Sequence, residues 1–153
     1  KIWMLKIIKS GLLKVLIMFF LFIPAKTFAG QSAQIVINAF NFKNDNGTAR
    51  FSLYNRAKGF PSKHKYAHFS ASVPIINNSA TVRFENVSYG EYGISVLHDE
   101  NNNYKMDSNL IGMPKEGFGI SNYKDKKARP SYDKAKIIVD DDVVININMF
   151  YLD

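Results

Sequence analysis

Hydrophobic and polar positions alternate along most of the chain after residue 30. In residues 33–42 and 48–55 the apolar side chains recur at every second position, and many are β-branched or aromatic. Period two is the spacing of a half-buried strand. The Asn46-Gly47 pair between the two segments is typical of tight hairpin turns, because both residues tolerate positive φ. The pattern therefore predicts a hairpin.

The same alternation continues to the end of the chain without helical periodicity. It predicts five more strands, over residues 67–76, 80–87, 91–98, 133–139 and 142–152. Seven strands with regular turns predict an all-β domain over residues 30–153. We expect a single seven-stranded antiparallel β-sandwich with immunoglobulin-like or transthyretin-like topology. Residues 99–132 lack a clear period, and so long an irregular run is usually functional or held by a ligand.

The first 29 residues are a different kind of sequence. They carry five lysines and no acidic residue, and residues 15–23 form an uninterrupted apolar run. Thr27-Phe28-Ala29 then places small residues where signal peptidase cleaves. The pattern predicts a signal peptide at residues 1–29, cut after Ala29, and hence a periplasmic or secreted protein that meets the membrane only during export. The alternative is an uncleaved N-terminal anchor.

The charge of the chain is less informative than it first looks. The formal net charge is +7 with a pI near 9.5, which is typical of proteins that bind polyanions. Residues 30–153, however, hold 15 basic and 13 acidic residues, so the domain carries about +2. We therefore expect no nucleic-acid partner. The one basic cluster of the domain, residues 124–129, is either a solvated loop or a contact for lipopolysaccharide, anionic glycan or phospholipid.

The irregular segment opens on an oxygen-rich motif. Asp99, Asn101, Asn103 and Asp107 have the spacing of positions 1, 3, 5 and 9 in an EF-hand-type calcium loop, and the carbonyl of Lys105 falls at position 7. Ca²⁺ prefers six to eight oxygen ligands, which carboxylates, amides and carbonyls supply. The spacing predicts a Ca²⁺ site; the alternative is an Asn-rich surface turn without an ion.

Two positions depart from that pattern. Tyr104 stands at position 6, where Gly normally provides a positive φ, and Leu110 stands at position 12 in place of a bidentate Glu. Glu116, in the following loop, is a candidate to complete the site. That loop is constrained by its glycines and proline, and we expect it to bind a partner or to pack as a structural Ω-type loop. Its candidate binding residues are Gly112, Pro114, Glu116, Gly117, Phe118, Ser121 and Asn122.

These segments also carry a resemblance. The run His98-Asp99-Glu100-Asn101 with Asp107, and the following residues 112–122 (GMPKEGFGISN), resemble the pattern of a bacterial envelope family called domain of unknown function 2141. Residues 58–61, 90–92 and 128–132 match further elements of it. The resemblance extends over about residues 33–152. It implies an exported β-sandwich protein with no established activity, and it raises the expectation of Ca²⁺.

Histidines offer little catalytic support. His98 alternates inward with apolar neighbours, which favours a packed side chain over a ligand. His64 and His68 would form a zinc pair only on a helix, which Pro61 and the following strand disfavour. We therefore predict a binding or structural module with a Ca²⁺-ordered loop and an envelope protein or glycan as partner. The alternative is an envelope hydrolase using His98 and Glu116.

Overall fold

The computed structural model describes residues 30–124 and 129–152. The predicted leader, residues 1–29, lies outside them. The described residues form eight strands: β1 (Ser32–Phe40), β2 (Thr48–Tyr54), β3 (Phe69–Val73), β4 (Ser79–Ser88), β5 (Gly90–Asp99), β6 (Phe118–Ile120), β7 (Ile137–Val139) and β8 (Val143–Asn148). A 3-10 turn, η1 (His64–Tyr66), and a one-turn helix, α2 (Tyr132–Ala135), complete the elements. No helix in the described part of the chain is long and apolar enough to cross a membrane.

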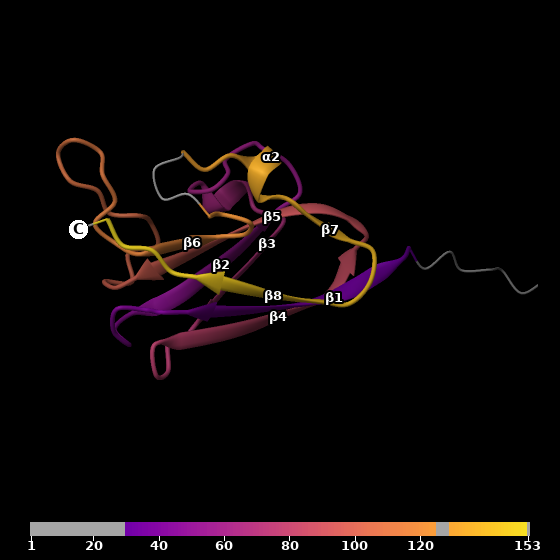
Figure 1. Cartoon of the computed structure of the whole chain (residues 1–153), viewed down its shortest axis with the longest axis horizontal. Helices are drawn as coiled ribbons and strands as arrows, with labels where there is room; N and C mark the ends of the chain where they lie inside the picture. Colours follow the sequence, from indigo (N-terminus) through magenta and orange to yellow (C-terminus); the bar gives the residue numbers. More distant parts are fainter. Residues whose placement is uncertain (1–29, 125–128, 153) are drawn as a thin grey trace, which may run out of the picture. The chain divides into compact units, whose positions relative to one another are not determined.

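The strands form two sheets (Figure 1). One has the order β4-β1-β8; the other has the order β3-β2-β5-β6, with β7 added on β5. The predicted β class and sandwich-like layering are confirmed. The strand count and the wholly antiparallel pairing are wrong, because β6 was not foreseen and β8 runs parallel to β1. Parallel neighbours need a crossover connection, and the chain reaches β8 only after it has passed through the larger sheet.

The buried faces follow the alternation in the sequence. Ile35, Ile37 and Ala39 of β1 are fully buried, as are Phe51 and Leu53 of β2. Each large apolar side chain so buried stabilises the fold by roughly 1.5–3 kcal/mol. The corresponding inward residues of β4 and β5 are Ala80, Val82, Phe84, Tyr92, Ile94 and Val96. Together these residues form the core between the two sheets.

The predicted hairpin at Asn46-Gly47 is wrong. β1 pairs with β4 and β8, whereas β2 pairs with β3 and β5, so the turn carries the chain from one sheet to the other. Gly47 has a φ of 66°, and a Cβ there would lie 2.0 Å from the carbonyl oxygen of Asp99. The glycine is therefore needed for a close approach between this crossing and the end of β5, and not for a two-residue hairpin.

The two sheets differ on their outer faces. On the larger sheet several outward side chains of β2 and β5 are buried although they are polar; they include Ser52, Ser95 and Asp99. Residues 55–66 are tied onto this face, because Ser95 Oγ and Tyr54 Oη both donate hydrogen bonds to the carbonyl of Pro61. In Figure 1 the loops and α2 lie above this sheet, on the side away from β1, β4 and β8.

Candidate calcium loop and ligand-binding groove

Asp99 organises the loop that follows β5. Its side chain is fully buried, and its two carboxylate oxygens accept the backbone N–H groups of Asn103 (3.0 Å) and Tyr104 (2.9 Å). The guanidinium of Arg50 lies 3.7 Å from Oδ2. The carboxylate thus closes the first turn of the loop and neutralises a largely buried cation.

Tyr104 adopts the conformation that its position demands. Its φ is 69°, as expected where Gly normally stands, and a left-handed conformation costs a non-glycine residue on the order of 1–3 kcal/mol. The Tyr104 ring lies over the guanidinium of Arg50, 4.4 Å from its centroid to Cζ. This cation–π contact, together with the hydrogen bond to Asp99, offsets part of that cost.

The remaining motif side chains gather on Asp107. The amide groups of Asn101 and Asn103 donate to the two oxygens of the Asp107 carboxylate, at 2.7 and 3.0 Å. These two bonds lower the pKa of Asp107, so the group stays ionised at neutral pH. The side-chain oxygens of Asn101 and Asn103 face backbone N–H groups instead, and the Asn103 oxygen accepts the N–H of Lys105. The structure therefore brings the predicted side chains together, with the loop closed by its own hydrogen bonds.

That geometry fits Ca²⁺ only in part. Two carboxylates, Asp99 and Asp107, are available, but both Asn oxygens are turned toward backbone N–H groups. Among the described residues, no cluster of three or more His, Asp or Glu side chains is placed to hold a metal. Occupation by an ion would require the Asn101 and Asn103 side chains to rotate, so that their oxygens turn inward.

Glu116, the candidate to replace the Glu that is missing at position 12, acts as a clasp: it holds the loop through hydrogen bonds to its backbone. Leu110 projects fully into solvent, whereas Glu116 is only 5 % exposed. The Glu116 oxygens accept the N–H groups of Glu100 (3.0 Å) and Asp107 (2.9 Å), near the two ends of the loop. Burial raises the pKa of Glu116 despite these two bonds. The carboxylate therefore fastens the loop to the segment that follows it.

The second half of the predicted binding loop is packed. A Cβ on Gly117 would lie 2.4 Å from the ring of Tyr151, so only glycine fits there. Ser121 is buried and donates to the carbonyl of Ala135 (2.6 Å), and Asn122 donates to that of Lys136 (3.0 Å). Phe118 begins β6, and its ring contacts those of Tyr123 and Phe150 at tilted angles. These residues hold the loop on the sheet, and the Ser121 hydroxyl is engaged in its hydrogen bond to the backbone.

The first half of that loop borders a groove of about 500 Å³ on the outer face of the larger sheet. Gly112, Pro114 and Phe118 line it, as predicted candidates. The other lining side chains come from the sheet, the 55–66 segment, the loop after β5, the region before α2 and the segment after β8; they include Leu97, Ile120, Met106, Tyr123, Leu152, His64 and Arg129. Of these, the sequence predicted only Arg129, in the basic cluster, as a ligand contact. The wall is mostly apolar, with polar groups at its rim. The matches at 58–61 and 128–132 were a further sequence signal for this groove, because they supply its lining residues Pro61, Arg129 and Pro130.

Neither His98 nor the pair His64 and His68 forms a reactive site. His98 is fully buried, its Nε2 donates to the carbonyl of Asn46 (2.9 Å), and its Nδ1 lies 2.7 Å from the hydroxyl of Tyr151. The interpretation of His98 as a packed side chain is confirmed, and the hydrolase alternative gains no geometric support. His64 lies in η1 with its Nδ1 2.8 Å from Ser52 Oγ, and His68 lies beyond the end of that turn.

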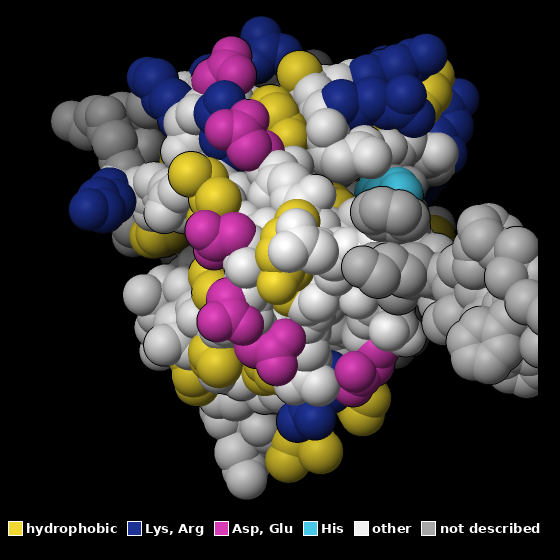
Figure 2. All heavy atoms as spheres, turned by 90° about the vertical axis from the view of Figure 1, so that its right-hand side faces the viewer, with side chains coloured by type: hydrophobic (Ala, Val, Ile, Leu, Met, Phe, Trp, Pro, Cys, Tyr) yellow, Lys and Arg dark blue, Asp and Glu magenta, His cyan; other side chains and the backbone are white. Residues whose placement is uncertain are grey.

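Charge is unevenly distributed over the domain. Figure 2 shows acidic side chains across the middle of one end of the molecule and basic side chains gathered along its upper edge. That edge is the side on which Figure 1 places α2 and the 55–66 segment. The predicted basic cluster at 124–129 falls partly outside the described residues; Lys124 and Arg129 are described, and both are exposed.

The fold and site define a small β-sandwich-like domain with one loop-covered sheet face and a groove in that cover. A family model described as an uncharacterized protein conserved in bacteria, domain of unknown function 2141, matches residues 37–146. The chain belongs to that family, which confirms the resemblance in the sequence. No curated protein and no solved structure matched the chain.

Proposed function

We propose that the domain is a ligand-binding module of the bacterial envelope, and that its ligand occupies the groove on the outer face of the larger sheet. The observation that carries the proposal is a cavity of about 500 Å³ whose wall is mainly apolar. Concave, preformed and largely apolar sites with a few polar groups are typical of ligand pockets. The clasp of Glu116 and the packing of β6 keep this wall in place.

The groove favours an apolar ligand group over a free glycan. Leu97, Met106 and Phe118 offer no hydrogen bonds, so sugar hydroxyls buried against them would lose their water without compensation. The polar groups at the rim, such as His64 and Arg129, suit a ligand with one polar end. An apolar segment of an envelope protein, or the tail of an amphiphile, meets both requirements.

Binding to the groove is tested with the fluorescent apolar anion anilinonaphthalene sulfonate. We expect saturable fluorescence enhancement and amide chemical-shift changes confined to groove residues. Met106→Glu, which places a charge in the wall, should lower the affinity by about tenfold, equivalent to roughly 1.4 kcal/mol. The matched control is Met113→Glu, on an exposed side chain of the same loop. Equal binding by both variants would refute the groove as the site.

The envelope location rests on the leader. Its lysines, apolar run and Thr27-Phe28-Ala29 motif support export with cleavage after Ala29. We expect the full chain expressed in a Gram-negative host to appear in the periplasmic fraction with Gly30 as its N-terminal residue. Recovery of the intact N-terminus in the membrane fraction would instead support the uncleaved anchor.

We further propose that Ca²⁺ binds the loop through Asp99, Asn101, Asn103, Asp107 and the carbonyl of Lys105. The ionised Asp107 carboxylate and the left-handed backbone at Tyr104 support this. Ca²⁺ should then raise the melting temperature, and Asp107→Ala should abolish that rise. Asp142→Ala, which removes an exposed carboxylate elsewhere, should retain it. If EGTA leaves the wild-type melting curve unchanged, the loop is closed by hydrogen bonds alone.

A further inference from the structure

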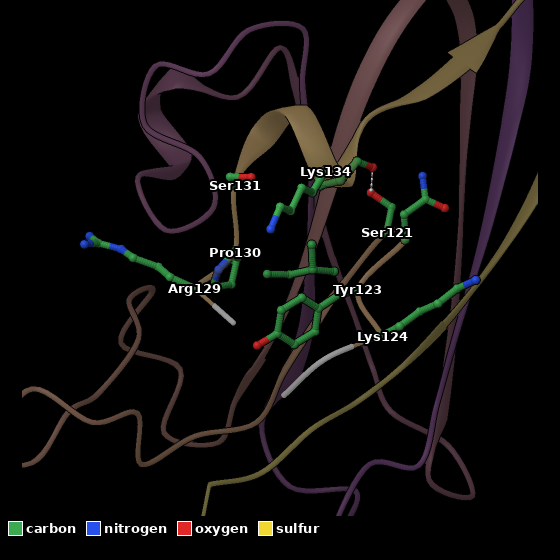
Figure 3. Close-up of a pocket in the computed structure, with 10 residues that line it drawn as sticks. Ser121, Tyr123, Lys124, Arg129, Pro130, Ser131 and Lys134 are labelled. Carbon is green, nitrogen blue, oxygen red and sulfur yellow. Dashed lines mark hydrogen bonds between the residues drawn. The ribbon is translucent and has the colours of Figure 1, made fainter. Parts of the chain in front are cut away.

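The groove adjoins a second, smaller cavity. This cavity has a volume of about 210 Å³ and lies between the end of β6 and α2 (Figure 3). Four of the described residues line both spaces: Ile120, Tyr123, Arg129 and Pro130. A ligand large enough to extend past these residues would therefore contact both walls at once.

The two cavities differ in character. Among the described residues, the smaller one is lined by three cations, Lys124, Arg129 and Lys134, and by no acidic side chain. Within the described residues, no carboxylate lies at ion-pair distance from any of the three. Asp133, the neighbouring acid on α2, is not part of the wall.

Lys134 is the cation best placed to meet a ligand. In Figure 3 its ammonium end turns into the space between Pro130 and Tyr123, whereas Lys124 and Arg129 extend outward on opposite sides. Ser131, also in the wall, adds a hydroxyl. An anion bound there would contact Lys134 directly, and Arg129 lies at the boundary with the apolar groove.

We infer that the two cavities form one site for an anionic amphiphile. A phosphate or carboxylate head occupies the cationic cavity against Lys134, and the apolar tail lies in the groove along Leu97, Phe118 and Ile120. This inference rests on the proposed groove and adds the chemical class of its ligand. Charge complementarity selects an anionic head group. Burial of the apolar tail supplies most of the affinity, at roughly 25 cal/mol per Å² of tail surface.

Three soluble probes separate the parts of this inference: decyl phosphate, decyl maltoside and inorganic phosphate, each titrated below micelle formation by calorimetry. We expect decyl phosphate to bind about tenfold tighter than decyl maltoside, the value of one charge-assisted hydrogen bond of roughly 1.5 kcal/mol. Inorganic phosphate should bind far more weakly than decyl phosphate, because it lacks the tail.

Substitution of Lys134 tests whether the anionic head group occupies the cationic cavity. Lys134→Gln should lower decyl phosphate affinity by about tenfold and leave decyl maltoside unchanged. Arg83→Gln is the matched control: it removes one exposed positive charge from β4 in the other sheet and should change neither affinity.

The outcomes distinguish this inference from the groove itself. Equal affinity for decyl phosphate and decyl maltoside would overturn the anionic head while leaving the groove intact. Equal affinity for decyl phosphate and inorganic phosphate would show a separate anion pocket and overturn the joined site. If neither alkyl probe binds and Met106→Glu has no effect, the groove proposal fails as well.

Discussion

The outer faces of the two sheets differ in how their polar side chains obtain hydrogen-bond partners. On the smaller sheet, polar side chains remain exposed and pair with one another: Asn38 donates to Asn146 (3.1 Å), and Thr81 donates to Asn38 (2.9 Å). On the larger sheet, polar side chains such as Asp99 and Ser95 are buried and bonded to covering loops.

This difference indicates where a ligand site can arise. A face whose polar groups satisfy one another in water needs no cover and offers no cavity. On a face whose polar groups anchor loops, those loops form walls above the sheet. The spaces between the loops are the groove and the cationic cavity. We therefore expect the loop-anchoring hydrogen bonds to contribute more to stability than the surface pairs.

The largest effect is expected for Asp99→Ala. The substitution removes the acceptor of two backbone N–H groups and leaves Arg50 largely buried without its counter-charge, so we expect unfolding free energy to fall by roughly 3 kcal/mol. Urea denaturation measures it. Asp142→Ala removes an exposed acceptor of the Gln34 N–H at the smaller sheet and should cost about 1 kcal/mol or less. Similar losses for both variants would contradict the comparison.

Glu116→Gln should have the next largest effect. One side-chain oxygen is retained, but an NH₂ group then faces a backbone N–H, so one of the two clasp bonds is lost at a cost of about 1–3 kcal/mol. Amide exchange at Glu100 and Asp107 should accelerate. Glu85→Gln, at an exposed pair with Gln34, should stay within about 0.5 kcal/mol of wild type. Unchanged exchange in Glu116→Gln would rule out the clasp.

Acidification should weaken the covered face through His64. Burial, followed by repulsion from Arg50, holds the pKa of His64 below its ordinary 6.5. The unfolded chain thus takes up the proton first, so this contribution is complete above pH 6.5 and is lost as the pH falls through the folded-state pKa. Wild-type stability should therefore decrease between pH 7 and pH 5, and His64→Gln should flatten that decrease. Parallel pH profiles for the two proteins would exclude His64 as the cause.

The smallest effect is expected on the uncovered face. A double-mutant cycle of Asn38→Ala and Asn146→Ala should give a coupling free energy of about 0.2–1 kcal/mol, because the pair is solvent-exposed. A coupling larger than the loss in Asp99→Ala would reverse the ranking of the two faces.

The sequence predicted best those strands that turn one face to the core. The segments expected at 80–87 and 91–98 agree closely with β4 and β5, because burial imposes period two on them. β6 was missed because it has only three residues around a glycine. The turn signal at Asn46-Gly47 predicts a hairpin where the chain crosses between sheets, because a local turn signal does not reveal which sheet receives the next strand.

The part of the site whose residues lie close together in the sequence, the loop after β5, was predictable. Spacing alone predicted that Asp99, Asn103 and Asp107 belong to one loop, and that position 6, here Tyr104, has a left-handed backbone, as it does. It did not predict the hydrogen bonds by which these side chains close the loop. The groove was not predictable in this way. Its lining extends from Pro61 to Leu152, and those residues meet only after both sheets have formed.

The parallel pairing of β1 with β8 also sets the order in which the domain can fold. Residues 35–40 pair with residues 143–148, whereas every strand of the larger sheet lies within residues 48–139. A chain emerging from its N-terminus can thus assemble the groove-bearing sheet while one edge of β1 still awaits its partner. Unpaired edges recruit strands from other chains, so aggregation should be most severe in proteins truncated before residue 143.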